Sequence, residues 1–250
     1  MEAMNDATVD SAVAIQLLSS RREFEEASSL YQRVFGYDDR FTLNSKVMRA
    51  LSYAGGVALG ARTESGELVG FVYGFPALDD GVNYLFSQAA CVAEPSRGHG
   101  IGQALKRQQR SESIARGLTK VRWAFDPLNT RNGFINLDLL GSRGRWYRPD
   151  FYDDGASDRL IVEWDAAVSA DAAATDVDWA SVDTARVGVA QQVGNSQIVI
   201  VFPPAESAPS FARTKAMRAI RASVEAGFAV ISCPRIAPRV HAYVLTRNQP

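Results

Sequence analysis

The sequence predicts a mixed α/β fold of the α+β kind, in which a mostly antiparallel sheet is flanked by helices. Apolar residues recur at helical spacing in some segments and form short β-like runs in others. One β-like run leads through a glycine-rich turn directly into a helix-like stretch, over residues 84–116. Hydrophobic content of 46% and charged content of 22% are ordinary for a globular protein, and 250 residues allow one large domain or two small ones.

The N-terminal part of the chain predicts a helix followed by antiparallel strands. The helix is expected over residues 21–35, where apolar residues recur at helical spacing and Gly36 follows as a stop. Glu64-Ser65-Gly66 is a hairpin signal between the first two strands, and Pro76 is expected to end the second. The three strands are predicted over residues 57–62, 68–75 and 84–92.

The middle of the chain predicts alternating helices and strands. A helix over residues 103–116 follows the glycine-rich turn, and a strand is expected over residues 120–125. A second helix is expected over residues 128–140 with Gly141 as its C-terminal stop. A further strand is predicted over residues 158–164.

The C-terminal part predicts a separate β-α-β-β extension. Residues 166–186 are rich in Ala, Asp and Ser and weakly periodic, which predicts a linker. The extension, residues 187–250, is expected to contain strands over 197–202, 228–232 and 241–246 and a helix over 210–226. Such a unit cannot bury its helix alone, so we expect it to pack on a main domain formed by residues 10–165 or to form a small second lobe.

Several classes of site are not expected from the composition. The two cysteines, Cys91 and Cys233, and the two histidines, His99 and His241, are too few and scattered for a structural metal site. We therefore expect no metal. No run of 18 apolar residues occurs and the N-terminus lacks a basic region, so neither a membrane segment nor a secretory signal is expected. A cytoplasmic location is the default expectation.

Charge is distributed unevenly along the chain. Residues 97–148 carry 11 basic and 3 acidic side chains, a net charge of +8. Residues 1–95 and 149–250 carry net charges of −6 and −3. The positive block suits a small polyanionic ligand. Nucleic acid is not expected as a partner, because the segment has no interleaved aromatics and no RNA-binding motif.

The segment Arg97-Gly98-His99-Gly100-Ile101-Gly102 predicts an anion site, because it joins a strand to the start of a helix. A kinase- or ATPase-type loop would need Gly-Lys-Ser/Thr at its end, whereas Gln103-Ala104 follows here. A dinucleotide fingerprint would need G-x-G-x-x-G, and the spacing does not fit. The remaining pattern is Arg-x-x-Gly-x-Gly, with Arg97, Gly100 and Gly102 in register.

This pattern resembles the acyl-CoA pyrophosphate loop of the GCN5-related N-acetyltransferase (GNAT) superfamily, where it joins the fourth strand to the third helix. The resemblance covers about residues 10–165 and suggests a bacterial branch with a C-terminal extension. It implies the GNAT fold and an acyl-CoA-dependent N-acyltransferase, above all an acetyltransferase. The co-substrate would be acetyl-CoA or another acyl-CoA, the acceptor a small-molecule amine, and transfer would be direct.

The resemblance also implies which residues bind the co-substrate. Main-chain N–H groups of the loop would hold the pyrophosphate, at Arg97, Gly98, His99, Gly100, Ile101 and Gly102. The end of the preceding strand would be splayed or bulged and would contact the pantetheine arm and thioester, at Cys91, Val92 and Ala93. Asn129 and Asn132, near the start of a helix, would either cap it or bind the pantetheine arm.

The catalytic acid departs from the family pattern. Many relatives carry a tyrosine four residues before the glycine that ends the helix after the fifth strand, and here that position is Leu137. Tyr147 and Tyr152 are the substitute candidates, with Tyr152 slightly favoured, and each also fits a tyrosine at the rim of the core. Glu94 could orient a water as base, or be a solvated or capping group.

A second function remains open. The missing helix tyrosine also fits a non-catalytic acyl-CoA-binding sensor or scaffold. A homodimer is compatible with either function.

Overall fold

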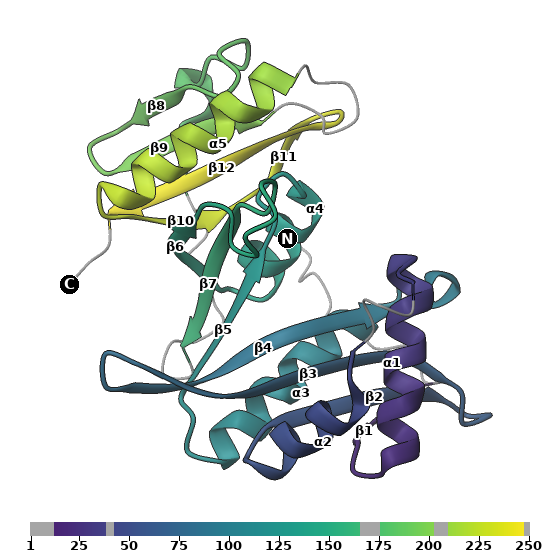
Figure 1. The fold of residues 1–250 in the computed structure, drawn as a ribbon. Coiled ribbons are helices and arrows are strands. Elements are labelled where there is room, and N and C mark those ends of the chain that lie inside the picture. The colour runs from purple at the N-terminus through teal and green to yellow at the C-terminus, as the bar shows by residue number, and fades with distance from the viewer. Residues whose placement is uncertain (1–12, 39–42, 166–175, 203–209, 248–250) are drawn as a thin grey trace, which may run out of the picture. The chain divides into compact units, whose positions relative to one another are not determined.

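Figure 1 shows the computed structural model of the chain, which describes residues 13–38, 43–165, 176–202 and 210–247. The residues cluster into two units, an N-terminal unit (Met1–Arg122) and a C-terminal unit (Trp123–Pro250). The boundary lies within strand β5 (Lys120–Phe125). The domain limits expected from the sequence, at residues 165 and 187, stay a prediction.

The sheet of the N-terminal unit has the strand order β1-β2-β3-β4-β5. Its first four strands are antiparallel neighbours, and β4 pairs in parallel with the beginning of β5. Their bounds are β1 (Val13–Leu17), β2 (Val57–Thr63), β3 (Leu68–Asp79) and β4 (Val82–Val92). The predicted hairpin at residues 64–66 is confirmed, since Gly66 donates its N–H to the Thr63 carbonyl oxygen at 2.9 Å.

Helices cover both faces of this sheet (Figure 1). One face packs α1 (Arg21–Phe35) and α2 (Ser45–Tyr53) over a core cluster that includes Phe24, Met48 and Phe71. The other face packs α3 (Ile101–Ala115). The bounds predicted for α1 are confirmed. Ser20 forms a capping box with Glu23 at its start, and Gly36 ends it in the left-handed region, with φ of +67°.

Strand β3 continues through Pro76 to Asp79, so the prediction that Pro76 would end the strand is wrong. The pairing of β2 with β3 reaches only to Gly74, whereas β4 pairs with β3 along its whole length. Pro76 therefore lies where one side of β3 carries no β2 partner. Proline, which lacks an N–H donor, is tolerated at such an edge position.

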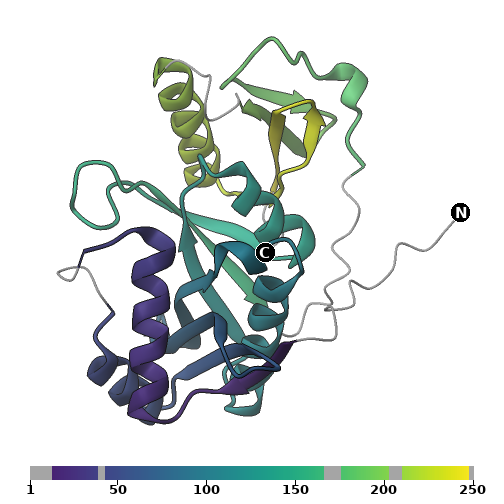
Figure 2. The same cartoon turned by 90° about the vertical axis from the view of Figure 1, so that its right-hand side faces the viewer.

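The C-terminal unit contains a second set of paired strands, in the order β5-β7-β6-β10-β12-β9-β8, with β11 paired to β12. The strand bounds are β6 (Arg143–Arg148), β7 (Arg159–Asp165), β8 (Ala190–Val193), β9 (Gln197–Phe202), β10 (Phe228–Ser232), β11 (Arg235–Ala237) and β12 (Val240–Arg247). The longest helix, α5 (Ser210–Glu225), packs on these strands (Figure 2). A shorter helix, α4 (Thr130–Phe134), continues into a π-helical turn, η3 (Ile135–Leu139).

The predicted β-α-β-β extension is confirmed as β9, α5, β10 and β12. It joins the preceding part of the unit directly, because Val230 of β10 pairs with Gly144 of β6. The same arrangement occurs twice in this unit. In β5-α4-β6-β7 and in β9-α5-β10-β12, the last strand lies between the two strands that the helix connects.

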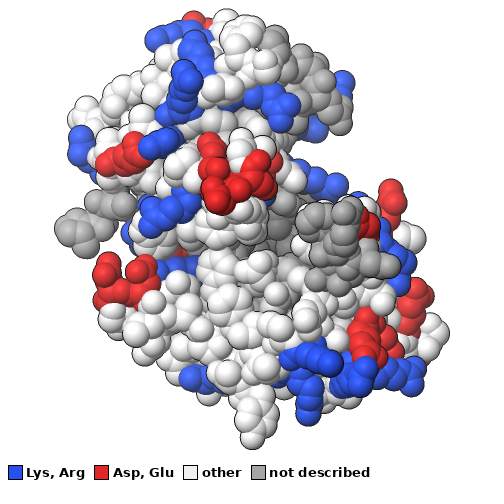
Figure 3. All heavy atoms as spheres, viewed as in Figure 1, with Lys and Arg blue, Asp and Glu red and all other residues white. Residues whose placement is uncertain are grey.

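Charged side chains form small groups on the surface drawn in Figure 3, some of one sign and some of both signs. Within the described ranges, no helix is both long and apolar enough to cross a membrane.

Candidate functional site

The segment between β4 and α3 begins with a short 3-10 turn, η2 (Glu94–Ser96). Arg97 N donates to the Glu94 carbonyl oxygen at 3.2 Å and closes this turn. The Arg97 side chain folds back, and its Nε donates to the Val92 carbonyl oxygen at 3.2 Å. The arginine of the motif is therefore tied to the end of β4.

Two glycines give the loop its path after Arg97. Gly98 has φ of +89° and Gly100 has φ of +76°, a region that glycine adopts without a steric penalty. A Cβ atom at either position would have nothing within 4 Å. Backbone conformation, and not lack of space, is thus the reason for glycine at both positions.

Helix α3 begins with uncapped N–H groups. Its first residue is Ile101, two residues earlier than expected, so Gly102 lies in the first turn. The N-cap residue Gly100 offers no side-chain oxygen, and the N–H groups of a first helical turn have no intrahelical partner. The helix dipole adds partial positive charge at the same place. The described loop therefore has the geometry of an anion site.

Close packing holds the start of α3 against the sheet. A Cβ atom on Gly70 of β3 would lie 3.2 Å from Leu105 Cδ1 and 3.3 Å from both Ile101 Cγ2 and the Cys91 carbonyl oxygen. Ile101 and Leu105 are themselves buried. The position of the uncapped helix end relative to β4 is thus fixed by core contacts.

A bulge interrupts the pairing of β3 with β4. Tyr73 pairs with Ala89 and Gly74 pairs with Ser87, which leaves Gln88 as the extra residue on β4. The β4 backbone approaches Gly74 so closely that a Cβ atom there would lie 2.6 Å from the Phe86 carbonyl oxygen. A bulge leaves one backbone unit outside the regular ladder.

The end of β4, at Cys91, Val92 and Ala93, was expected to be splayed or bulged. Among the described residues the strand pairs with β5 only at Leu85 and Phe86, so its end runs without a β5 partner, as a splayed end does, whereas the bulge lies earlier on β4. Cys91 and Val92 pair regularly with β3, and Ala93 N donates to the Val69 carbonyl oxygen at 2.7 Å. The Ala93 N–H group is therefore already used within the fold. The sequence did not reveal the bulge at Gln88, because its position depends on which residue of β3 faces β4, and no local signal encodes that.

Cys91 lies on the face of β4 that carries α1 and is buried. Burial raises the pKa of its thiol to about 12, although the Arg97 and Arg33 guanidinium groups act in the opposite direction. A thiol with this pKa is protonated at neutral pH and is a poor nucleophile. Its side chain is a core residue.

Polar side chains of α3 reach the bulge from the other face of the sheet. Lys106 Nζ donates to Ser87 Oγ at 2.7 Å, and burial lowers the pKa of this amine to about 7. Gln109 is fully buried, and neither end of its amide has a partner among the described residues. The sequence analysis did not single out these residues, although the polar Gln109 on the buried stripe of α3 is a signal for this contact.

Two titratable side chains near the loop lie at the surface. Glu94 and His99 are both exposed. Neither side chain makes a hydrogen bond with another described residue. The carboxylate and the imidazole are thus exposed, and no described side chain orients them by a hydrogen bond.

Tyr147 and Tyr152, the candidate acids, belong to the C-terminal unit. Tyr147 is 5% exposed, and its hydroxyl group donates to Asp158 Oδ2 at 2.5 Å. Burial and this bond to a carboxylate raise the pKa of Tyr147 well above its usual value. The hydroxyl proton of Tyr147 is therefore already engaged in a hydrogen bond to Asp158.

Tyr152 has different surroundings, on the loop between β6 and β7. Its side chain is 52% exposed, and its hydroxyl group has no partner among the described residues. The loop is held in place because Tyr152 N donates to Ser157 Oγ at 2.8 Å. The Arg159 guanidinium lies 5.2 Å from the centre of the Tyr152 ring. Of the two tyrosines, Tyr152 is the one with an accessible hydroxyl group.

The remaining expected positions lie on α4 and the π-helical turn. Asn129 is the N-cap of α4, and its Oδ1 accepts the N–H of Asn132 at 3.1 Å. Of the two roles expected for Asn129, capping and pantetheine binding, the structure shows capping. The Asn132 side chain is exposed. Leu137 is fully buried, and Gly141 follows the turn with φ of +71° as expected.

Two hydrogen bonds to Asp138 join the π-helical turn to the C-terminal extension. Asp138 accepts hydrogen bonds from Ser232 Oγ and from Cys233 N, the latter at 2.8 Å. Desolvation raises the pKa of Asp138 despite these two bonds. Sequence reasoning missed this contact because 94 residues separate Asp138 from Ser232.

Comparison with known proteins supports the fold. No family model and no curated protein matches the sequence. A GNAT-family protein from Desulfovibrio desulfuricans is similar over 62% of this chain and 100% of its own, with 15% identity and a TM-score of 0.51. yncA from Salmonella typhimurium, solved with acetyl-CoA, is similar over 62% and 95%, with 16% identity and a TM-score of 0.51.

A chain of the NatC complex, solved with Gag peptide and CoA, is similar over 62% of this chain and 98% of its own. Its identity is 14% and its TM-score 0.50. Similarity at these identities establishes the arrangement of the backbone. The chain thus has the fold of the GCN5-related N-acetyltransferase (GNAT) superfamily.

Proposed function

We propose that the protein is an acyl-CoA-dependent N-acyltransferase, above all an acetyltransferase, acting on a small-molecule amine. The observation that carries this proposal is the uncapped N-terminus of α3 behind Arg97–Gly102 at the end of β4, in a GNAT fold. The similar structures yncA and NatC were solved with acetyl-CoA and CoA.

The described loop suits a pyrophosphate group. Glycines at positions 98 and 100 leave the space beside the backbone open. The N–H groups of the first turn of α3 supply donors, and the helix dipole and Arg97 supply positive charge. These features would hold the pyrophosphate mainly through the backbone.

Acyl transfer makes two further demands on the chain. When bound, acyl-CoA would supply an activated acyl group, and the amine nitrogen would displace the thiolate from its carbonyl carbon. We propose the bulge at Gln88 as the source of a main-chain donor to the carbonyl oxygen, where one such N–H contributes about 3 kcal/mol in other enzymes.

Proton transfers would use exposed groups. An alkyl amine has a pKa of about 10 and must lose a proton before it attacks, so Glu94 through a water is our candidate base. Tyr152 is our candidate donor to the leaving thiolate, since its hydroxyl group is accessible. The hydroxyl group of Tyr147 is held by Asp158.

A non-catalytic acyl-CoA sensor is the second candidate. Two observations favour the sensor. A buried leucine, Leu137, stands at the usual tyrosine position, and the Tyr147 hydroxyl group already donates to Asp158. A thiol-release assay with a broad amine panel separates the two. Binding of acetyl-CoA without turnover of any amine would favour the sensor, and turnover would establish the enzyme.

Two substitutions of Gly102 test the loop itself. A Cβ atom at Gly102 would touch only Val92 Cγ2, at 3.7 Å, so Gly102→Ala should fold and bind. Gly102→Glu places a carboxylate in the first turn of α3, which suits the helix dipole but repels a pyrophosphate. We expect acetyl-CoA to bind the Glu variant at least about tenfold more weakly than the Ala variant in calorimetry. Equal affinities would remove the basis of both candidate functions.

A further inference from the structure

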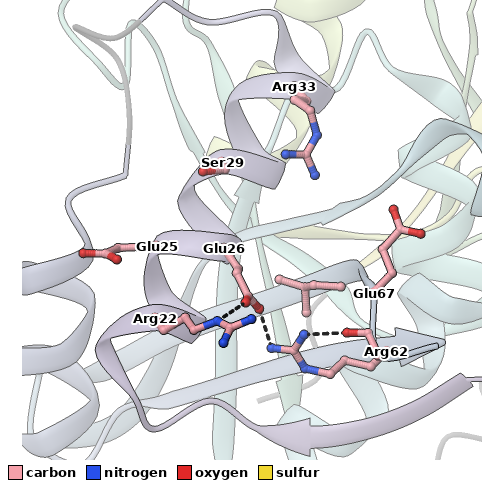
Figure 4. A pocket seen from close by; sticks show the side chains of 9 residues that line it. Arg22, Glu25, Glu26, Ser29, Arg33, Arg62 and Glu67 are labelled. Atoms are coloured by element: carbon pink, nitrogen blue, oxygen red, sulfur yellow. Dashed lines mark hydrogen bonds and ion pairs between the residues drawn. The ribbon is translucent and has the colours of Figure 1, made fainter. Parts of the chain in front are cut away.

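A cavity of about 450 Å³ lies within the N-terminal unit, between α1 and the β2–β3 hairpin (Figure 4). Successive turns of α1 form one wall, and the end of the hairpin forms the other. No residue of the loop from Arg97 to Gly102 is among those that line it. Its volume is in the range of small-molecule sites.

An ion network forms part of the cavity lining. Arg62 Nη2 lies 2.7 Å from Glu26 Oε2, and Arg22 Nε lies 3.1 Å from Glu26 Oε1. Arg62 also donates to the Gly66 carbonyl oxygen at 2.9 Å. The hydrogen bond from Arg62 is the main cause of the lowered pKa of Glu26. These charges neutralise one another and fasten α1 to the hairpin.

Two further charged residues line the same cavity without an ion-pair partner among the described residues. Arg33 of α1 and Glu67, the residue before β3, form no ion pair with each other or with another described residue. Figure 4 shows both side chains reaching into one space from the two walls. The Ser29 hydroxyl, one turn before Arg33 on α1, also lines the cavity and is exposed. Besides the paired charges of the ion network and Glu25, which pairs with Arg21, the described lining of the cavity thus offers one unpaired cation, one unpaired anion and one hydroxyl group.

We propose that this cavity binds a small zwitterion of the α-amino-acid class, with its carboxylate at Arg33 and its ammonium group at Glu67. The planar guanidinium matches a carboxylate with two parallel hydrogen bonds. A dianion would meet the Glu67 carboxylate, and a diamine would meet the Arg33 guanidinium. A ligand with both charges pairs both groups at once.

Calorimetry and thermal shift with glycine and L-alanine test this proposal, independently of acyl-CoA binding. Acetate and methylammonium, which each carry one of the two charges, serve as ligand controls. We expect the two amino acids to bind and to stabilise the protein, and each single-charge compound to bind at least about tenfold more weakly.

Matched variants locate the site. Arg33→Gln and Glu67→Gln each remove one of the unpaired charges, and both side chains are exposed, so neither change should disturb folding. Lys46→Gln on α2 and Glu64→Gln on the hairpin remove exposed charges outside the cavity. We expect at least about tenfold weaker amino-acid binding in the first two variants and no change in the controls.

Three results would overturn the proposal. They are no binding of either amino acid to the intact protein, equal binding of acetate and glycine, and unchanged affinity in Arg33→Gln or Glu67→Gln. None of these results depends on the loop at Arg97–Gly102, so the proposed acyltransferase function would stand or fall separately.

Discussion

Tyr147 and Tyr152 lie five residues apart, yet their hydroxyl groups have different chemical surroundings. The buried Tyr147 hydroxyl is a structural donor to Asp158, whose other oxygen accepts the N–H of Asp150 at 2.9 Å. This pair fixes the base of the β6–β7 loop. Tyr152, further along the loop, keeps an exposed hydroxyl group that can approach a ligand.

Phenylalanine substitutions should therefore affect different properties at these two positions, namely activity at Tyr152 and stability at Tyr147. Tyr152→Phe should lower kcat by about 100-fold or more if its hydroxyl group is the acid, with little change in the free energy of unfolding. Tyr147→Phe should leave Asp158 Oδ2 without its donor, while Oδ1 keeps the bond from Asp150 N, and should lower the free energy of unfolding by about 1–3 kcal/mol. Steady-state kinetics and urea unfolding measure both quantities. A large loss of kcat in Tyr147→Phe with full stability would reverse the assignment.

Asp138 shows how one residue stabilises the junction of two elements. Its carboxylate on the π-helical turn accepts bonds from Ser232 and Cys233 at the end of β10. Asp138→Ala would leave two buried donors unpaired and should cost about 2–4 kcal/mol of unfolding free energy. Ser232→Ala removes one donor together with its bond and should cost less. Chemical denaturation compares the two, and equal costs would contradict this account.

Helix α3 carries an expected pH effect on stability. The pKa of Lys106 falls from its usual value of 10.5 to about 7 in the folded protein. Between these values the unfolded chain binds the extra proton, so the free energy of unfolding should rise with pH. The slope from this residue is at most about 1.4 kcal/mol per pH unit. Below about pH 7 both states are protonated and the slope vanishes.

Lys106→Met is the matching variant, because it keeps an unbranched side chain of similar length. Its free energy of unfolding should change less between pH 7 and pH 9 than that of the original protein. The difference between the two curves isolates Lys106 from other titrating groups. Parallel curves would show that the Lys106 amine is solvated in the folded state.

Local signals explain which elements could be predicted. Helix α1 was predicted with its observed bounds because its apolar stripe and its glycine stop agree. Helix α2 was missed, since its nine residues bury only Met48 and its N-cap Asn44 is a weak signal alone. Strand β6 was missed because Arg143, Arg145 and Arg148 conceal its alternation. Short polar elements of this kind are stabilised by their neighbours and not by their own pattern.

The candidate site likewise contains a part that the sequence could predict and a part that it could not. The loop at residues 97–102 could be predicted, because glycine spacing directly reflects backbone dihedral angles. The bulge at Gln88, the bond from Lys106 to Ser87 and the cavity residues Arg33 and Glu67 depend on how distant segments meet. A single sequence contains no local signal for such tertiary contacts.

At the scale of the whole molecule, the C-terminal extension is continuous with the sheet that precedes it. The connection runs through β6 and β10, where Gly144 faces Val230. A Cβ atom on Gly144 would lie 2.9 Å from Val230 Cβ and 2.8 Å from Leu160 Cδ2. The two β-α-β-β segments of this unit therefore meet at a position that admits only glycine.

Gly144→Val should push β6 away from β10 and destabilise the C-terminal unit by about 1–3 kcal/mol or more. Ala190→Val, the same kind of enlargement at an exposed position on β8, should have little effect. Hydrogen exchange distinguishes two organisations of the chain. If the strands form one cooperative sheet, Gly144→Val should reduce protection in β6 and β7 as well as in β10 and β12. Loss confined to β10 and β12 would instead mean that the extension from residue 187 folds as a domain of its own.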